Sequence, residues 1–248
     1  MTTADKYHLI RRRMVDAARR ANRDPASVTL VAVSKGGSMD QIADLIACGH
    51  LDFGESRVQQ LQDRIAALPA ILETRGMDPG LAMAVRWHMI GHLQRNKAAT
   101  AAGHSWLIHS VDSMRLAEEL ESIGQRRGKM IRALLEVNVS GEESKYGVKL
   151  PAARHMYEQF RNMSALRFVG LMTMAPNHPD PEKAREYFII LRELFDEIRL
   201  ESDPTDDFDQ LSMGMSNDFE AAVEEGATLI RVGTAIFGPS QTQALESL

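Results

Sequence analysis

Short apolar runs alternate with helical patterns along the whole chain, and this alternation restricts the fold more than any other feature of the sequence. The apolar runs number eight, at residues 28–34, 50–54, 85–90, 106–110, 131–139, 166–174, 211–214 and 228–232. Between them, apolar side chains recur at the spacing of one helix face. Units of one strand and one helix build parallel sheets. Eight such units predict an α/β fold with a closed (β/α)8 barrel, the TIM barrel, rather than an open sheet.

The helical patterns lie where such a barrel needs them. One helix, at about residues 4–23, precedes the first strand as an addition to the barrel. Later patterns cover residues 39–48, 58–68, 94–101, 181–201 and 217–225, and two further helices are expected to begin at Asp112, a good N-cap, and near Pro151. Residues 69–84 contain two prolines and two glycines and are predicted to be irregular.

The composition is that of one globular domain. Of the 248 residues, 44% are hydrophobic and 25% are charged. Length alone allows one barrel or two smaller domains, but no stretch rich in proline, serine or glycine marks a boundary. We therefore expect a single domain over residues 1–248. The single cysteine, Cys48, excludes an intramolecular disulfide and fits a reducing compartment.

Charge and apolar content argue against several classes of partner. The net charge of −5 disfavours nucleic acids and anionic membranes, which select for clustered basic charge. An arginine cluster within residues 11–23 is interpreted as the solvated face of the N-terminal helix. The first residues lack the apolar core of a signal peptide, and no run approaches the ~20 apolar residues that cross a bilayer. We therefore expect a cytoplasmic protein without nucleic-acid or membrane partners.

The functional candidates lie after the predicted strands, because reactive groups of this fold sit on the loops at the carboxyl-terminal ends of the strands. They are Lys35, Glu55, His88, Asn138, Met172, Ser212 and Arg231. Lys35 directly follows the first strand, and on its own a solvated surface lysine is the commoner explanation. A barrel mouth that partly desolvates the amine would populate its neutral form, which condenses with aldehydes.

The last strand is followed by a candidate phosphate loop. Gly233 and Thr234 lie after the eighth strand, where barrels of this kind commonly bind phosphate through backbone N–H groups. A plain tight turn explains the glycine equally well. Ser212, at the end of the seventh strand, can donate its hydroxyl to the same phosphate. An aldehyde-binding lysine and a phosphate loop together indicate pyridoxal 5'-phosphate (PLP), which carries one aldehyde and one phosphate.

Two other groups allow more than one interpretation. Arg231 lies in an apolar strand and must find a partner, which is either a carboxylate or, in a PLP pocket, the pyridine nitrogen. His88 and His92 are not predicted to bind a metal, because a strand end with a glycine between them differs from the helical HExxH arrangement. Residues 138–147 form a polar loop that contains glycine, and we expect it to be mobile.

Several segments of the chain resemble the YggS/PROSC family of PLP homeostasis proteins. These segments are residues 31–35, 53–59, 87–97, 138–140 with 144–147, 170–174, 211–218 and 231–238. They occur in order over nearly the whole chain. The resemblance implies the barrel of fold-type III PLP enzymes, which is shared with alanine racemase.

The same resemblance implies roles for individual residues. It implies that Lys35 forms the internal aldimine with PLP and that Arg231 faces the pyridine nitrogen. It implies that Ser212, Gly233 and Thr234 bind the phosphate. We also assign Ser56, His88 and Met172 to the cofactor pocket. The chain departs from the family pattern at Ser56, where an asparagine is usual, and at Gly36 and Gly37, which predict a more flexible loop after Lys35.

By this resemblance the protein holds PLP on a lysine and acts in intracellular PLP (vitamin B6) homeostasis without substantial turnover. Its partners would be PLP and PLP-dependent apo-enzymes. An amino-acid racemase of fold type III and a Schiff-base aldolase are the alternatives, since both would use Lys35. An aldolase needs no pyridine partner, so Arg231 and the phosphate loop together disfavour it.

A racemase is disfavoured because it needs a base on each face of the substrate α-carbon. In the barrel-type racemases that the chain resembles, the second base is a tyrosine from an added C-terminal β domain of the partner subunit. This chain ends about ten residues after Gly238, and among its four tyrosines only Tyr146 lies near a barrel-mouth loop. An arginine at the pyridine nitrogen also weakens PLP as an electron sink. We expect a monomer, since no partner subunit is needed to complete the site.

Overall fold

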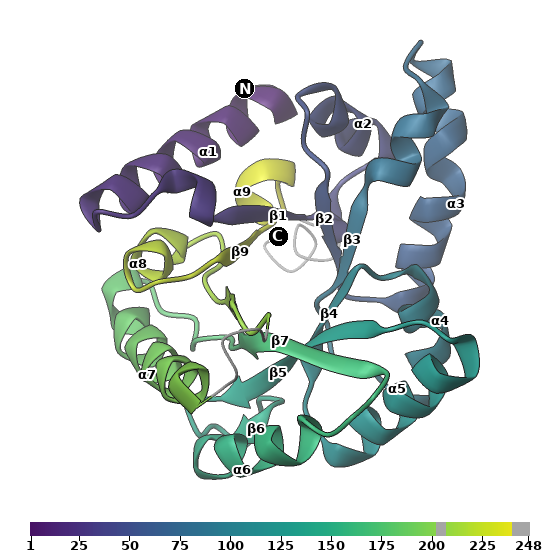
Figure 1. The fold of residues 1–248 in the computed structure, drawn as a ribbon. Helices are drawn as coiled ribbons and strands as arrows, with labels where there is room; N and C mark the ends of the chain where they lie inside the picture. Colours follow the sequence, from purple (N-terminus) through teal and green to yellow (C-terminus); the bar gives the residue numbers. More distant parts are fainter. Residues whose placement is uncertain (202–206, 240–248) are drawn as a thin grey trace.

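Eight parallel strands close into a barrel at the centre of the molecule, in a computed structural model that describes residues 1–201 and 207–239 (Figure 1). The barrel strands are β1 (Thr29–Val33), β2 (Asp52–Glu55), β3 (Arg86–Met89), β4 (Leu107–Val111), β5 (Ile131–Asn138), β7 (Leu166–Met172), β8 (Gln210–Ser212) and β9 (Leu229–Val232). β9 pairs with β1, and β4 pairs with β5, so the ring has no open edge. The predicted (β/α)8 barrel is confirmed.

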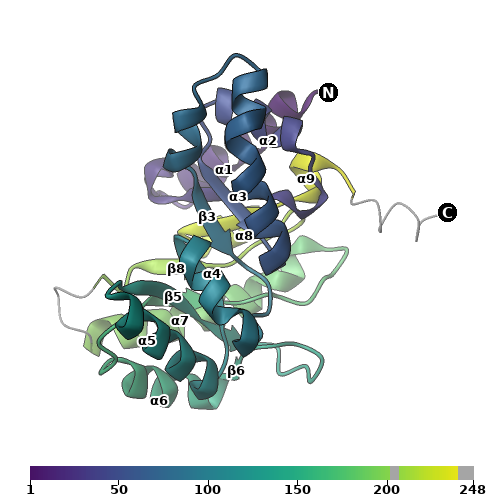
Figure 2. The same cartoon turned by 90° about the vertical axis from the view of Figure 1, so that its right-hand side faces the viewer.

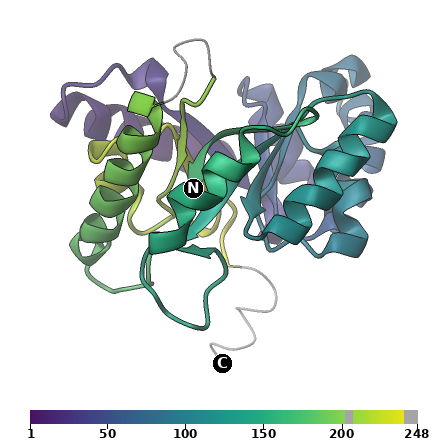
Figure 3. The ribbon, with the colours of Figure 1, turned by 60° about the horizontal axis from the view of Figure 1, so that its bottom comes forward.

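Helices surround the strands on the outside of the ring. They are α1 (Thr3–Arg20), α2 (Met39–Ala47), α3 (Val58–Thr74), α4 (Ala98–His104), α5 (Met114–Arg127), α6 (Leu150–Phe160), α7 (Arg185–Glu201), α8 (Phe219–Glu224) and α9 (Thr234–Phe237). Figure 2 shows α2 and α3 beside each other, and Figure 3 shows α7 across the strands from α4 and α5. The added helix α1 packs against α2, α8 and α9.

Shorter elements lie in the connections. A two-residue strand, β6 (Val148–Lys149), pairs with β5 and was not predicted. The 3₁₀ turns are η1 (Pro25–Ser27), η2 (Ser34–Gly36), η3 (Pro79–Ala84), η4 (Arg95–Lys97) and η5 (Pro181–Ala184). Within the described ranges, no helix is both long and apolar enough to span a membrane. The prediction of one domain over residues 1–248 includes residues 202–206 and 240–248, which lie outside the described residues.

Two helix boundaries differ from the prediction. We predicted irregular structure from residue 69, but α3 continues through Pro69 to Thr74. Pro69 is exposed, while the neighbouring Leu68 and Leu72 are buried, and their burial offsets the hydrogen bond that proline cannot donate. The N-cap of α5 is Ser113 rather than Asp112. The Asp112 carboxylate instead lies 3.1 Å from His92 Nδ1.

The barrel has two cores. Most buried apolar side chains lie between the strands and the helices in one large cluster. A separate apolar cluster fills part of the barrel interior and consists of Val31, Leu107, Leu134, Val169, Met172 and Leu229. Because strand side chains alternate between the two faces, the same strands also direct buried polar residues inward. These inner polar side chains determine what the barrel can bind.

Candidate functional site

A pocket of about 500 Å³ lies at the carboxyl-terminal ends of the strands. Five of the predicted site residues line it, namely Lys35, Ser56, Arg231, Gly233 and Thr234. Among the described residues that line it, Lys35 is the only lysine. Strand direction explains this grouping, since parallel strands bring the loops that follow them to one end of a barrel.

The turn that carries Lys35 is held from both sides by one arginine. Lys35 lies in η2, directly after β1. Arg64, from α3, donates hydrogen bonds to the carbonyl oxygens of Ser34 at 2.7 Å and Gly37 at 2.9 Å. These two carbonyls flank Lys35 in the chain. The backbone is therefore fixed on both sides of the lysine, while the lysine side chain stays exposed to the pocket.

A buried carboxylate anchors this arginine. Glu55 is buried, its Oε1 lies 2.6 Å from Arg64 Nε, and the Ser34 hydroxyl donates to the same oxygen at 2.6 Å. Burial raises the pKa of Glu55, although Ser34 and Arg64 oppose the shift. We predicted flexibility at Gly36 and Gly37. Gly37 instead packs so closely on Phe237 that an added Cβ would lie 2.5 Å from its ring.

A hydroxyl and two backbone N–H groups form a small cradle at the start of α9. The N–H groups of Gly233 and Ala235 lie 3.3 and 3.4 Å from Ser216 Oγ. Gly233 also approaches β1 so closely that an added Cβ would lie 3.2 Å from the Val33 carbonyl oxygen. Backbone N–H groups and a hydroxyl are suited to bind an anion such as phosphate. Sequence reasoning missed Ser216, whose signal is its position beyond the strand end in the loop after β8.

Three predicted site residues lie below the pocket rather than in its lining. Ser212, His88 and Met172 are buried and do not belong to the described residues that line the pocket. Met172 belongs to the apolar cluster inside the barrel, and the other two form hydrogen bonds there. All three lie within strands, whose inward side chains fill the barrel below the pocket.

The inner wall of the pocket combines a buried cation with a buried carboxyl. Arg231 is 4% exposed and donates from Nη2 to the Thr173 carbonyl oxygen at 2.7 Å. Burial lowers the pKa of Arg231 to about 10, so it is charged at neutral pH. Glu136 is 3% exposed, and burial together with Asp112 raises its pKa to about 7. Its Oε2 has no hydrogen-bond partner among the described residues.

An aromatic pair closes one side of the pocket. The Tyr146 and His92 rings stack with centroids 3.8 Å apart and an angle of 11° between their planes. Tyr146 lies in the loop after β5, which we predicted to be mobile. The Asn138 side-chain amide instead holds that loop by donating to the carbonyl oxygens of Glu142 at 2.9 Å and Lys145 at 3.2 Å.

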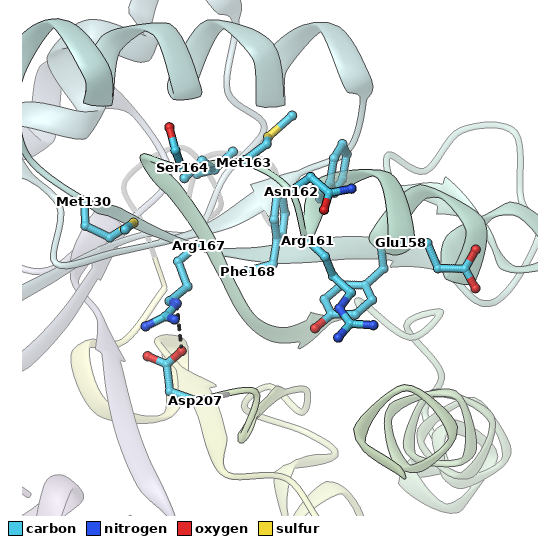
Figure 4. Close-up of a pocket in the computed structure, with 12 residues that line it drawn as sticks. Met130, Glu158, Arg161, Asn162, Met163, Ser164, Arg167, Phe168 and Asp207 are labelled. Carbon is cyan, nitrogen blue, oxygen red and sulfur yellow. Dashed lines mark ion pairs between the residues drawn. The ribbon is translucent and has the colours of Figure 1, made fainter. Parts of the chain in front are cut away.

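A second pocket, of about 520 Å³, lies toward the opposite end of the barrel and is lined mainly by α6, the start of β7 and the connection between them (Figure 4). Met130 and Phe168 line it together with Arg167 and Asp207. The Asp207 carboxylate pairs with Arg167 at 3.3 Å and with Arg132 at 3.8 Å. The described residues contain no group of three histidine, cysteine or acidic residues placed to hold a metal ion.

Comparison with known proteins identifies the family. The model of the alanine racemase N-terminal domain matches residues 9–241. A pyridoxal phosphate homeostasis protein from Aquifex aeolicus is 36% identical over 96% of this chain and 98% of its own length. Its human counterpart is 34% identical over 92% of this chain and 83% of its own length.

Solved structures agree with this result. PipY from Synechococcus elongatus, in a structure with PLP bound, is 36% identical, covers 92% of this chain and 100% of its own, and has a TM-score of 0.73. An alanine racemase from Clostridium difficile shares the fold at 12% identity and a TM-score of 0.63, with 96% of this chain and 62% of that chain covered. The chain belongs to the pyridoxal phosphate homeostasis protein family and has the alanine racemase N-terminal barrel.

Proposed function

We propose that this protein binds PLP in the pocket at the carboxyl-terminal end of the barrel and holds it covalently through Lys35. PLP supplies an aldehyde, which condenses with a lysine amine and releases water, and a phosphate, which can be held by N–H groups. The observation that carries the proposal is the pairing of Lys35 with the Ser216 cradle in one pocket. The relative PipY, whose structure contains PLP, supports it.

The residues present fit each end of this cofactor. Gly233, Ala235 and Ser216 are placed to bind the phosphate, together with the Thr234 hydroxyl at the pocket lining. Lys35 supplies the amine from a turn that Arg64 fixes. Arg231, a buried cation in the lining, is placed to donate a hydrogen bond to the pyridine nitrogen. Ser56 lines the same pocket and contributes a small polar surface.

The pocket favours holding PLP over catalytic turnover. Racemisation needs a second base that faces Lys35 across the substrate. Tyr146 is the only tyrosine among the described lining residues, and its ring is stacked flat on His92. A charged arginine at the pyridine nitrogen also disfavours ring protonation and so weakens PLP as an electron sink. We therefore propose a role in PLP homeostasis, in which a monomer delivers PLP to PLP-dependent apo-enzymes.

Titration with PLP tests this function. We expect a visible absorption band in the wild-type protein, no such band in Lys35→Ala, and an unchanged band in the matched control Lys145→Ala. Lys145 is suited as a control because it lies beside the pocket and its Nζ contacts the Met174 carbonyl oxygen at 3.5 Å. The PLP-loaded protein is then given single amino-acid enantiomers and, separately, an apo-enzyme. Transfer without racemisation is expected, and turnover of about 1 per second or faster would overturn the homeostasis role.

A further inference from the structure

A continuous chain of buried hydrogen bonds runs from Arg231 across the barrel interior to the first residue of β2. Arg231 Nη1 donates to Ser212 Oγ at 2.6 Å, and Ser212 Oγ lies 2.9 Å from His109 Nδ1. His109 Nε2 lies 2.9 Å from His88 Nδ1, and His88 Nε2 lies 3.2 Å from Asp52 Oδ1. Five strands, β9, β8, β4, β3 and β2, each contribute one member.

The chain has one direction of donation, which follows from the carboxylate at its Asp52 end. The Asp52 carboxylate only accepts hydrogen bonds, so His88 Nε2 carries a proton and donates it. Burial lowers the pKa of both histidines, so both rings are neutral and each carries a single N–H. His88 Nδ1 is therefore bare and accepts from His109 Nε2. His109 Nδ1 is bare in turn and accepts the Ser212 hydroxyl proton.

The opposite end is compatible with this direction. Arginine only donates, so Ser212 Oγ must accept from Arg231, and its own proton is available for His109. A buried cation thus stands at one end and a carboxylate at the other. Burial opposes ionisation of Asp52, but hydrogen bonds from His88 and Arg86 outweigh it and lower its pKa to about 2. Arg86 donates to the same Oδ1 at 2.7 Å and thereby fixes the carboxylate.

We propose that Ser212, His109, His88 and Asp52 form a positioning relay that aims the Arg231 guanidinium into the pocket. Of these four residues only Ser212 touches Arg231, and none belongs to the described lining of the pocket. They act through Arg231, whose orientation is fixed by Ser212 at Nη1 and by the Thr173 carbonyl at Nη2. The effect on the cofactor rests on the proposed function, in which Arg231 meets the pyridine nitrogen. The tautomers do not rest on it.

The tautomers are read in the protein without PLP by nitrogen NMR of ¹⁵N-histidine-labelled full-length chain at pH 7. We expect His88 and His109 to be neutral, each with a protonated Nε2 and a bare Nδ1. A protonated Nδ1 on either ring would overturn the relay. Because no cofactor is present, this result stands apart from whether Lys35 binds PLP.

The remote variant Asp52→Asn tests whether the relay transmits. It keeps the side-chain shape but removes the anion that sets the direction of donation. We expect the His109 ring signals to move, although His109 does not contact Asp52. We also expect the PLP dissociation constant to rise about three- to tenfold, with a shift of the absorption maximum of bound PLP.

The matched control is His50→Phe, which changes another buried histidine beside Asp52. His50 Nε2 contacts the Asp52 backbone carbonyl oxygen at 2.7 Å and lies outside the relay. The control should leave PLP affinity, the absorption maximum and the His109 signals unchanged even if thermal stability falls. Asp52→Asn could instead lower only the melting temperature, as the control does. In that case Ser212, His109, His88 and Asp52 contribute to stability alone and the relay is refuted.

Discussion

The two ends of the barrel hold pockets of nearly equal volume, about 500 and 520 Å³, but the side chains that line them differ. At the carboxyl-terminal end, the lining contains an exposed lysine and a buried carboxyl oxygen without a partner among the described residues. At the amino-terminal end, Arg167 and Arg132 share the Asp207 carboxylate. Two hollows of similar volume therefore differ in their chemistry, since one lining holds a lysine and a carboxyl oxygen without a described partner and the other holds a shared ion pair.

The two ends of the barrel also differ in the groups that surround their pockets. Trp106 partly covers the amino-terminal end and lies between Arg86 and Arg132, whose guanidinium carbons are 5.4 and 4.8 Å from its ring centroid. Cation–π and ion-pair contacts of this kind close the end of a barrel. At the other end, the N–H groups of Gly233 and Ala235 meet Ser216 Oγ after β9, and N–H groups of this kind bind anions.

The largest expected effect comes from removing Lys35. In Lys35→Ala we expect complete loss of the visible band and of covalent attachment, with some PLP retained through phosphate contacts. Arg167→Ala, which alters the charged lining at the opposite end, should leave the band unchanged. PLP titration followed by absorbance measures both. An equal loss of the visible band in both variants would contradict the placement of the PLP site at the carboxyl-terminal end of the barrel.

A second effect concerns Glu136 and depends on pH. Its pKa is about 7 in the folded protein and near 4.5 as an ordinary glutamate, so the folded state binds more protons between these values. Stability is therefore lost as the pH rises from about 4.5 to 7. Relative to wild type, Glu136→Gln should gain nothing at pH 4 and about 1 to 3 kcal/mol at pH 8. Urea unfolding of the PLP-free protein at both pH values measures this gain, and a pH-independent difference would contradict it.

A third effect distinguishes Ser212, the last residue of β8, from Ser216 in the loop after that strand. Ser216→Ala should weaken PLP binding about three- to tenfold, because one hydrogen bond contributes about 1 kcal/mol and the backbone donors remain. Ser212→Ala should lower the free energy of unfolding more than Ser216→Ala does. It removes the hydroxyl that is the hydrogen-bond partner of Arg231 Nη1 and His109 Nδ1, both of which are buried. Equilibrium binding and urea unfolding of both variants test this. An unchanged PLP affinity in Ser216→Ala would contradict the assignment of Ser216 to the phosphate.

The smallest effect is expected at the amino-terminal end. Asp207→Asn removes the shared partner of two partly exposed arginines, and such pairs contribute about 0 to 1 kcal/mol. PLP affinity should not change. The sign of the stability change should be opposite to that of Glu136→Gln at pH 8, since one carboxylate is paired and the other is not. A gain of stability in both variants would contradict this distinction.

The sequence predicted well the order of the strands and the end of the barrel at which the pocket lies, because apolar alternation and strand direction are local properties. It was less successful for features that side-chain packing determines. Pro69 is tolerated within α3 because the neighbouring Leu68 and Leu72 are buried, which no local pattern reveals. Ser212 and Ser216 both lie at the end of β8, and only the strand boundary decides which one reaches the pocket. The relay joins five strands that meet only when the barrel closes, so no spacing of residues in the sequence predicts it.

Borohydride reduction of the PLP-loaded protein, followed by peptide mass mapping, tests the central claim most directly. Reduction makes the bond between the cofactor and its lysine permanent, so the labelled peptide identifies the residue. The account predicts one pyridoxyl adduct, on the peptide that contains Lys35. An adduct on Lys97 or Lys145 instead, or no adduct at all, would contradict it.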